Sequence, residues 1–265
     1  MATAPTTAPP AAPALAGASR GTAWVLGEAE FSGVIAVTRW PIERARTMLP
    51  GGIALERPAG WRGGGHPVVV LFGVQARGAT RLAGVRLPLG RSYLELAVAV
   101  PGVCRGGEPM TALARMYADY FPAAWNGRVR YGFGKEHAEI RRTDGSFVVA
   151  RPAGPPLCAA VHAPAGAWAA AARAPGPPQV AAWLSAPLIG WTPAGRAVRS
   201  ASSWDVDGRL VRPVRASVHA FTPLLAGCGP GELLEDAAAF EVRNVRWSLG
   251  WPEADGRDVA PGGIV

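Results

Sequence analysis

Residues 116–137 read MYADYFPAAWNGRVRYGFGKEH, and they contain Lys135, the only lysine in the chain. Lysine and arginine together number 27, so the other 26 (27 − 1) are arginines. A guanidinium stays protonated in proteins, whereas a buried ammonium can lose its proton and become a nucleophile. Lys135 is therefore a candidate for covalent chemistry on a carbonyl group through a Schiff base. Codon bias against lysine is the alternative explanation, and it gives the position of this residue no functional meaning.

The composition favours one turn-rich β protein. A chain of 265 residues can bury a large core, and 49% of its residues are hydrophobic. The 34 glycines and 26 prolines disfavour long helices. A net charge of +8 invites a nucleic-acid function, but the arginines are scattered and no RNA- or DNA-binding signature accompanies them. We therefore expect no nucleic-acid partner.

The cysteines indicate a reducing compartment. Cys104, Cys158 and Cys228 lie far apart and show no metal-ligand spacing. An odd, sparse set of cysteines argues against a disulfide framework. The longest apolar runs, such as residues 68–74, are too short to span a bilayer. These features predict a cytoplasmic protein without a membrane partner.

The chain divides into one domain and two tails. Residues 1–22 are rich in Ala, Pro and Thr and lack the basic start of a signal peptide, which predicts a disordered tail. We expect a single domain over 23–252 and a flexible C-terminal tail over 253–265.

Short apolar runs separated by Gly- and Pro-rich turns predict many strands and few helices, and hence an antiparallel barrel or sandwich. Asp144-Gly145 between strand-like flanks indicates a hairpin, and a phase slip at residues 243–244 indicates a β-bulge. Residues 75–91 resemble a loop or loose hairpin, and 152–178 a long excursion. Short helices are expected at 42–48 and 231–238. Strands are expected at 31–38, 68–74, 93–100, 183–191, 197–204, 210–221 and 240–249.

A family resemblance joins several of these motifs. The sequence Met-Tyr-x-Asp at 116–119, the Gly-Arg pair at 127–128 and Lys135 follow the order of motifs in the acetoacetate decarboxylase superfamily. Residues 93–95 likewise resemble the Tyr-x-Glu strand of that family. The resemblance extends over about 31–252, and the combination is more specific than any single motif.

The resemblance implies a mainly β fold of the α+β type. It is a cone-shaped antiparallel β-barrel with flanking smaller sheets and a few short helices. Residues 111–119 by themselves favour a helix, but the resemblance makes them a strand. It also implies a homo-oligomer that needs no cofactor or metal, and an apolar cavity in which a lysine forms an imine with a small keto acid or ketone.

Carried over to this chain, the resemblance makes Lys135 the nucleophile and Glu95 the carboxylate that moves a proton. Arg128 would support the lysine strand or meet a substrate carboxylate. Tyr93 shares a strand face with Glu95, because side chains alternate along a strand, and His137 shares one with Lys135 in the same way. The further residues expected to bind substrate are Tyr93, Trp125, Phe133 and His137.

Two positions beside the lysine depart from the family pattern. Glu136 replaces the second lysine of the family motif, and Gly134 replaces its proline. A neighbouring carboxylate favours the ammonium form of a lysine, unless Glu136 points away from the cavity as adjacent strand residues do. The arginine expected near the start of the first strand is also missing, and Glu28, Glu30 and Ser32 occupy this region.

Two functions follow from this sequence. The first is a Schiff-base-forming lyase, which either decarboxylates a β-keto acid or performs aldol or dehydration chemistry on a 2-oxo acid. The second is a member of the same fold that binds or cyclises an apolar, polyketide-like molecule without an imine. The four histidines show no metal-ligand spacing, and no serine-hydrolase elbow or phosphate-binding loop is present.

Overall fold

The computed structural model describes residues 25–51, 53–82, 85–174, 176–221 and 233–255. The predicted N-terminal tail over 1–22 lies outside this part of the chain. The predicted C-terminal tail begins at 253, whereas the structure places Glu253–Ala254 in β17, which pairs with β13 (Ala197–Ser200). The rest of that tail, 256–265, lies outside the described residues.

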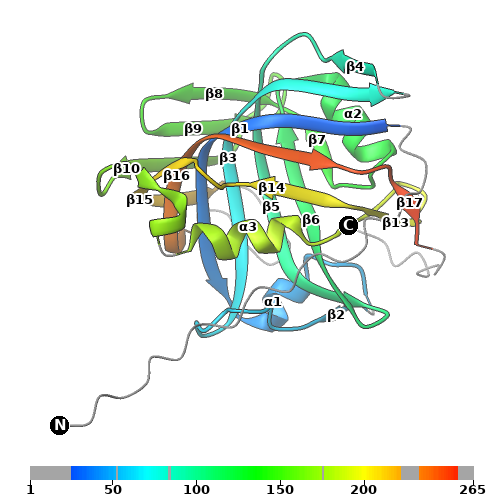
Figure 1. Ribbon diagram of the computed structural model, residues 1–265, viewed down its shortest axis with the longest axis horizontal. Coiled ribbons are helices and arrows are strands. Elements are labelled where there is room, and N and C mark those ends of the chain that lie inside the picture. Colours follow the sequence, from blue (N-terminus) through cyan, green and yellow to red (C-terminus); the bar gives the residue numbers. More distant parts are fainter. Residues whose placement is uncertain (1–24, 52, 83–84, 175, 222–232, 256–265) are drawn as a thin grey trace.

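Five long strands form the body of the molecule and run antiparallel to their neighbours in the order β16–β1–β3–β5–β6 (Figure 1). Their sequences are rich in the β-branched and aromatic residues that suit a pleated, buried surface. They are β1 (Val25–Trp40), β3 (His66–Leu82), β5 (Tyr93–Arg105), β6 (Glu108–Ala118) and β16 (Leu233–Leu249).

Three short strands close these five into a barrel. Strand β12 (Leu188–Trp191) pairs in parallel with β6 and antiparallel with β13. The chain then passes through Ala201 into β14 (Ser202–Asp205), which pairs with β16. The ladder therefore returns to the strand from which it started, and this closure brings the C-terminal third of the chain beside the N-terminal third (Figure 1).

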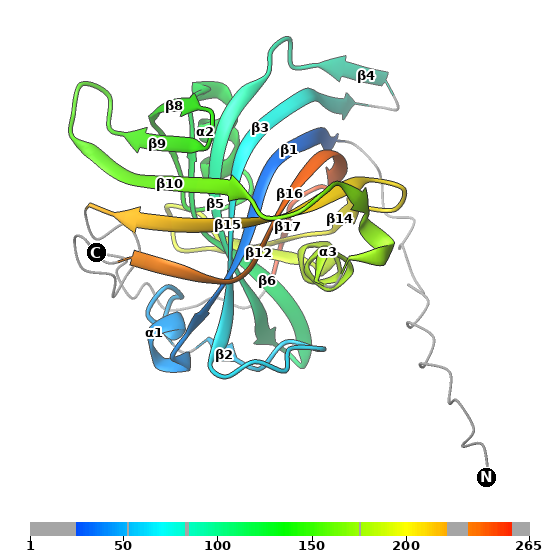
Figure 2. The same cartoon turned by 90° about the vertical axis from the view of Figure 1, so that its left-hand side faces the viewer.

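A smaller sheet covers one side of the barrel (Figure 2). Strand β15 (Leu210–Ala220) belongs to both layers, because it pairs with β16 and with β10 (Pro156–Pro164). Strands β8 (Glu139–Thr143) and β9 (Ser146–Ala150) extend the sheet as the predicted Asp144-Gly145 hairpin. The other elements are α1 (Ile42–Arg46), β2 (Ala54–Leu55), β4 (Val85–Pro88), α2 (Phe121–Val129), β7 (Lys135–His137), β11 (Ala169–Ala170), the 3-10 helix Ala171–Arg173 and α3 (Pro177–Ser185).

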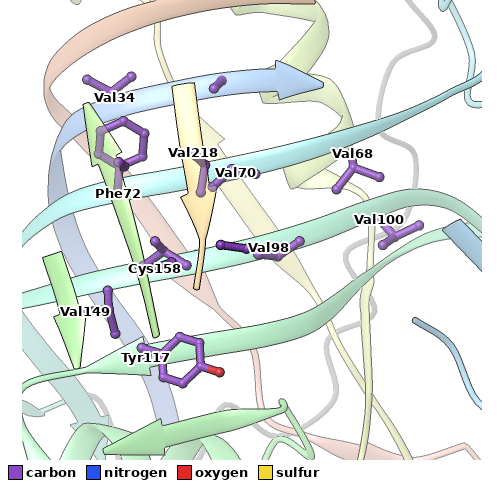
Figure 3. Packing of buried hydrophobic residues seen from close by; sticks show 14 of the residues in the cluster. Val34, Val68, Val70, Phe72, Val98, Val100, Tyr117, Val149, Cys158 and Val218 are labelled. Carbon is purple, nitrogen blue, oxygen red and sulfur yellow. The ribbon is translucent and has the colours of Figure 1, made fainter. Parts of the chain in front are cut away.

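The barrel strands are buried on both faces. Val98 and Val100 of β5 belong to one apolar cluster, which also contains Val149 and Val218 of the smaller sheet (Figure 3). The neighbouring Ala97 faces the other way and belongs to a second cluster on the opposite face of the strand. Because side chains alternate along the strand, β5 contributes residues to two apolar cores, one on each of its faces. The second cluster surrounds the cavity described below.

Three local predictions are wrong, and tertiary pairing explains the difference. The helix predicted at 231–238 is strand from Leu233 onward, because β15 supplies its backbone hydrogen-bond partners; residues 231–232 lie outside the described residues. The excursion at 152–178 contains β10, which is held between β9 and β15. The strand predicted at 183–191 is helix α3 up to Ser185, and β12 begins only after Pro187.

Other local predictions are confirmed. Residues 111–118 belong to strand β6, as the family resemblance implies and local propensity does not, and the strand ends one residue before Asp119. The short helix expected at 42–48 is α1, and the segment 75–91 holds the hairpin of β3 and β4.

Among the described residues, no helix is long and apolar enough to cross a membrane.

The predicted bulge lies where β16 crosses β1. Arg243 and Asn244 both stand opposite Ser32, so β16 carries one extra residue. Asn244 adopts a φ of 54°, and its backbone N–H donates a 2.9 Å hydrogen bond to Ser32 Oγ. Asparagine tolerates this left-handed conformation better than most other residues with a side chain, and bulky or β-branched side chains tolerate it least.

We expect Asn244→Ala to lower the free energy of unfolding by about 1–2 kcal/mol, because alanine is strained at positive φ. Asn244→Gly is the matched control: it also removes the side-chain amide but fits the backbone, so it should stay close to wild type. Urea unfolding of the three proteins measures the difference. Equal stability of the alanine and glycine variants would show that the conformation carries no strain.

Candidate active site

A cavity of about 360 Å³ lies inside the barrel and extends to α2. Its charged side chains are few, and most of the lining is apolar or aromatic. A concave, largely apolar space with a few convergent polar groups is the usual form of a small-molecule site. The aromatic side chains that line it are Phe31, Tyr93, Tyr120, Trp125, Tyr131, Phe133, Trp204 and Trp247.

Strand β7 carries Lys135 into this cavity. It pairs in parallel with β6, so that Lys135 stands beside Met116, and the backbone N–H of Met116 donates a 2.9 Å hydrogen bond to Gly134 O. Lys135 is buried with 6% of its surface exposed. A cation at this depth needs a partner, because burying an isolated charge is costly.

Glu95 of β5 is that partner. Its Oε2 accepts a short hydrogen bond from Lys135 Nζ, and Glu95 is itself 5% exposed. Its second oxygen, Oε1, accepts a 3.0 Å hydrogen bond from Gln75 Nε2. Gln75 Oε1 in turn accepts a 2.7 Å hydrogen bond from Trp247 Nε1. The chain of bonds from Trp247 to Lys135 holds the carboxylate in one orientation.

Tyr93 lies next to this pair. Lys135 Nζ lies 5.4 Å from the centre of the Tyr93 ring, a distance typical of a cation–π contact. Burial raises the pKa of Tyr93 well above its usual value, and the nearby carboxylates of Glu95 and Asp119 raise it further. Tyr93 therefore stays a neutral phenol at physiological pH. It adds an aromatic face and a hydroxyl group to the site, but no charge.

Glu136 points away from the cavity. It is the middle residue of β7, so its side chain leaves the opposite face of the strand from Lys135. Its carboxylate accepts a 3.4 Å hydrogen bond from Arg115 Nη1, and 43% of the side chain is exposed. The departure from the family pattern at this position therefore puts no second charge into the cavity.

The other predicted site residues divide into two groups. Trp125 and Phe133 line the cavity, Trp125 half-exposed on α2 and Phe133 buried. Arg128 and His137 do not line it. Arg128 is exposed on α2, and exposed His137 packs its ring 6.0 Å from the Phe121 ring. His137 lies two residues after Lys135 on β7, but of the residues in this strand only Lys135 lines the cavity.

Solved structures of known enzymes share this architecture. The enduracididine biosynthesis enzyme MppR, complexed with the condensation product of pyruvate and imidazole 4-carboxaldehyde, superposes with a TM-score of 0.58 at 15% identity, over 94% of this chain and 98% of that one. Acetoacetate decarboxylase from Legionella pneumophila subsp. pneumophila str. Philadelphia 1 gives 0.57 at 13% identity, over 94% and 92%. An acetoacetate decarboxylase-like enzyme from Sphingomonas wittichii RW1 gives 0.57 at 14%, over 90% and 95%.

The chain has the acetoacetate decarboxylase-like fold. The structures carry this conclusion, since no protein-family model and no curated protein matches the sequence. The cone-shaped, mainly β barrel expected from the motif order is therefore confirmed.

Within this acetoacetate decarboxylase-like fold, several cavity residues escaped prediction. Gln75, Trp204 and Trp247 come from strands far from the lysine in sequence, and no local motif marks them. Arg130 lines the cavity, although Arg128 was predicted. The last turn of α2 decides which of these two arginines reaches the cavity. The sequence motif alone does not contain this information.

The described residues show no ready-made metal site. No group of three or more His, Cys, Asp or Glu side chains in the described part of the chain is placed to hold a metal ion. His66, one of the four histidines, is a core residue with 1% exposure, and its Nε2 lies 2.8 Å from Pro101 O.

Gly127 of α2 makes room for the lysine. A Cβ atom at this position would lie 2.7 Å from Lys135 Cδ, closer than carbon atoms approach without displacement. We expect Gly127→Ala to shift the lysine and, for the imine chemistry that the sequence predicts, to slow the reaction of Lys135 by about tenfold or more, because misplacement of a reacting group is costly. Alanine also favours a helix by about 1 kcal/mol over glycine, so stability should not fall.

Two measurements made side by side test this prediction: urea unfolding, and the rate at which borohydride traps an imine between Lys135 and a keto acid as a stable adduct. Gly51→Ala is the matched control, since a Cβ atom there meets nothing within 4 Å. An unchanged trapping rate in Gly127→Ala would mean that the contact between helix and lysine does not position the amine.

Proposed function

We propose that this protein is a lyase that forms a Schiff base between Lys135 and a small keto acid or ketone. The observation that carries the proposal is the buried contact of Lys135 with Glu95 inside an otherwise apolar cavity. An amine becomes a nucleophile when its surroundings remove its proton. Here a carboxylate in direct contact with the ammonium is available to take that proton.

The first step of the proposed reaction uses this pair alone. Transfer of a proton from Lys135 to Glu95 leaves an amine with a free electron pair beside a carboxylic acid. The amine nitrogen then attacks the carbonyl carbon. The two protons that the nitrogen loses leave with the carbonyl oxygen as water, and Glu95 carries protons between these atoms. The product is an iminium ion on Lys135.

The iminium ion then acts as an electron sink. With a β-keto acid, the bond to the carboxylate breaks, carbon dioxide leaves, and the electron pair forms an enamine that takes a proton on carbon. With a 2-oxo acid, loss of a proton gives an enamine that can attack an aldehyde and later lose water. The solved neighbours support both routes, since one is an acetoacetate decarboxylase and another is complexed with a condensation product of pyruvate.

The position of Arg130 supports a substrate that carries a carboxylate. Among the described residues, it is the one arginine that lines the cavity, and its guanidinium carbon lies 5.4 Å from the Trp251 ring. A guanidinium binds a carboxylate through paired hydrogen bonds. We assign to Arg130 the contact with a substrate carboxylate, which was one of the two roles expected of Arg128.

The proposal also covers the cellular location, the oligomeric state and the partners of the protein. The sparse cysteines support a cytoplasmic location, and Cys104 and Cys158 are both free thiols. From the family resemblance and the composition we further propose a homo-oligomer that needs no cofactor and binds neither nucleic acid nor membrane.

Reductive trapping tests the proposed function. The protein is incubated with acetoacetate, pyruvate, phenylpyruvate or benzoylacetate and reduced with borohydride, and its intact mass is recorded. We expect a stable adduct at Lys135, with a mass increase equal to the mass of the trapped ketone minus one oxygen, because water leaves and two hydrogens are added. If none of the compounds in the panel gives an adduct, the proposed Schiff-base chemistry is refuted.

The apolar lining also favours a second candidate, a protein that binds or cyclises an apolar, polyketide-like molecule without an imine. In that case Lys135 serves only to pair with Glu95. Binding of such a ligand should then survive Lys135→Ala, and no ketone should be trapped.

A further inference from the structure

We propose that the carbonyl substrate carries an aromatic ring, as an aryl-substituted keto acid does, and that this ring lies among the aromatic side chains beside Lys135. The inference rests on the proposed function, because it names the substrate class of the same site. It is carried by the size of the cavity, by the arrangement of its aromatic residues and by the placement of its charges.

The cavity is too large for a small keto acid alone. Its volume of about 360 Å³ lies within the range of roughly 300–1,000 Å³ that is typical of sites for drug-sized ligands. Acetoacetate or pyruvate would fill only part of it and would leave apolar walls without contacts. Empty apolar space is unfavourable and tends to take up apolar ligands. The substrate is therefore expected to bring apolar bulk with it.

One aromatic wall adjoins the reacting pair. Trp204 of β14 stands opposite Trp247 of β16, and the Phe31 ring of β1 meets Trp204 edge to face at 5.8 Å. The hydrogen bond from Trp247 Nε1 to Gln75, which in turn holds Glu95, fixes this wall relative to the carboxylate. A substrate carbonyl at Lys135 thus has aromatic surface within reach of its substituent.

A second aromatic wall comes from the segment that precedes β7. The rings of Tyr131 and Phe133 stack at 5.4 Å with planes 24° apart, and both residues are buried. They belong to the same apolar cluster as Phe31, with Met116 also among its members. Aromatic pairs in offset or edge-to-face geometry gain more than burial of their area alone provides, which favours a planar ring over a saturated chain between such walls.

The charged groups leave one place for a carboxylate. Glu95 and Lys135 pair with each other, and Glu28 at the cavity wall is paired with Arg86 and Arg81. The hydrogen bond from Arg86, the larger effect, and that from Arg81 lower the pKa of Glu28, so it stays ionised. Arg130, exposed at the solvent side, is the cation in the lining with which a substrate carboxylate can pair.

Competition between matched substrates tests this inference. Initial rates of borohydride trapping are measured for phenylpyruvate, cyclohexylpyruvate and pyruvate, and for benzoylacetate against acetoacetate. Since one methylene in an apolar pocket is worth about tenfold or more, we expect each aryl compound to be trapped at least tenfold faster at equal low concentration. Cyclohexylpyruvate should fall between phenylpyruvate and pyruvate. Equal or faster trapping of the small compounds would overturn the inference and leave the proposed function intact.

A second measurement removes imine chemistry from the test. Binding of phenylpropionate and of propionate, which have no ketone, is measured by calorimetry on the wild-type protein. We expect phenylpropionate to bind at least tenfold more tightly. If it does so while no ketone is trapped, the proposed Schiff base fails and the aromatic site stands. If phenylpropionate shows no advantage over propionate, the aromatic site is refuted.

Two variants locate the ring. Trp204→Leu and Phe133→Leu each remove one aromatic wall and keep an apolar side chain. We expect each to lower the ratio of phenylpyruvate to pyruvate trapping by about tenfold, with circular dichroism as the check on folding. An unchanged ratio in a folded variant contradicts the location. The wild-type ratios decide the substrate class even if neither variant folds.

Discussion

Lys135→Ala is expected to lose every trace of the borohydride-stabilised adduct and to lower turnover by about 10⁴-fold or more. Removal of a covalent nucleophile eliminates the intermediate itself, and losses of this size or larger are typical of such residues. The measurement is intact mass after reduction, together with product formation under substrate saturation. The effect follows from a single atom, the nitrogen that forms the imine.

Lys135→Arg is the control that separates charge from nucleophilicity. Arginine can still pair with Glu95, but its guanidinium does not lose a proton and forms no imine. We therefore expect the arginine variant to fold and to be as inactive as the alanine variant. Trapping or turnover in either variant at more than about one hundredth of the wild-type rate would contradict a role for Lys135 as nucleophile.

Glu95→Gln is expected to fold and to slow imine formation by about 10²- to 10⁴-fold, the range for loss of a general acid–base group. The amide keeps the shape of the side chain and can still hydrogen-bond to Gln75, but it neither accepts nor returns a proton. Glu95→Ala should in addition cost about 3–5 kcal/mol of stability, because it leaves the buried ammonium without its partner. Trapping rates and urea unfolding measure the two effects.

Glu136→Gln is the matched control for Glu95→Gln. It makes the same chemical change one residue after the lysine, on the outward face of β7, where it weakens only the exposed pair with Arg115. We expect no change in trapping rate and a change in stability of about 1 kcal/mol at most. Comparable losses in the two variants would show that the effect of Glu95→Gln is not specific to the cavity.

The local sequence predicted those features that depend on strand alternation. Tyr93 and Glu95 do share a buried face, and Glu136 does point away from Lys135, because side chains alternate along a strand. The bulge at Asn244 was also visible, since an extra residue shifts the phase of the apolar positions. These features need only a few consecutive residues.

The rest of the site required the closed barrel. Gln75 and Trp247 are 172 residues apart, yet one hydrogen bond joins them. Likewise, Trp204 reaches the cavity because β14 pairs with β16. Such neighbours are set by the order of strands around the barrel, and no local pattern reports that order.

From the sequence one can read that the chain forms a turn-rich β protein, and that Lys135 and Glu95 lie in motifs that resemble those of the acetoacetate decarboxylase superfamily. Tertiary structure alone decided that residues 233–238 are strand, that Arg130 and not Arg128 lines the cavity, and that the aromatic walls adjoin the lysine. The two sets of features differ because they depend on interactions that act over different distances along the chain. Alternation and turn formation act between near neighbours, whereas barrel closure pairs distant strands and can override local helical preference.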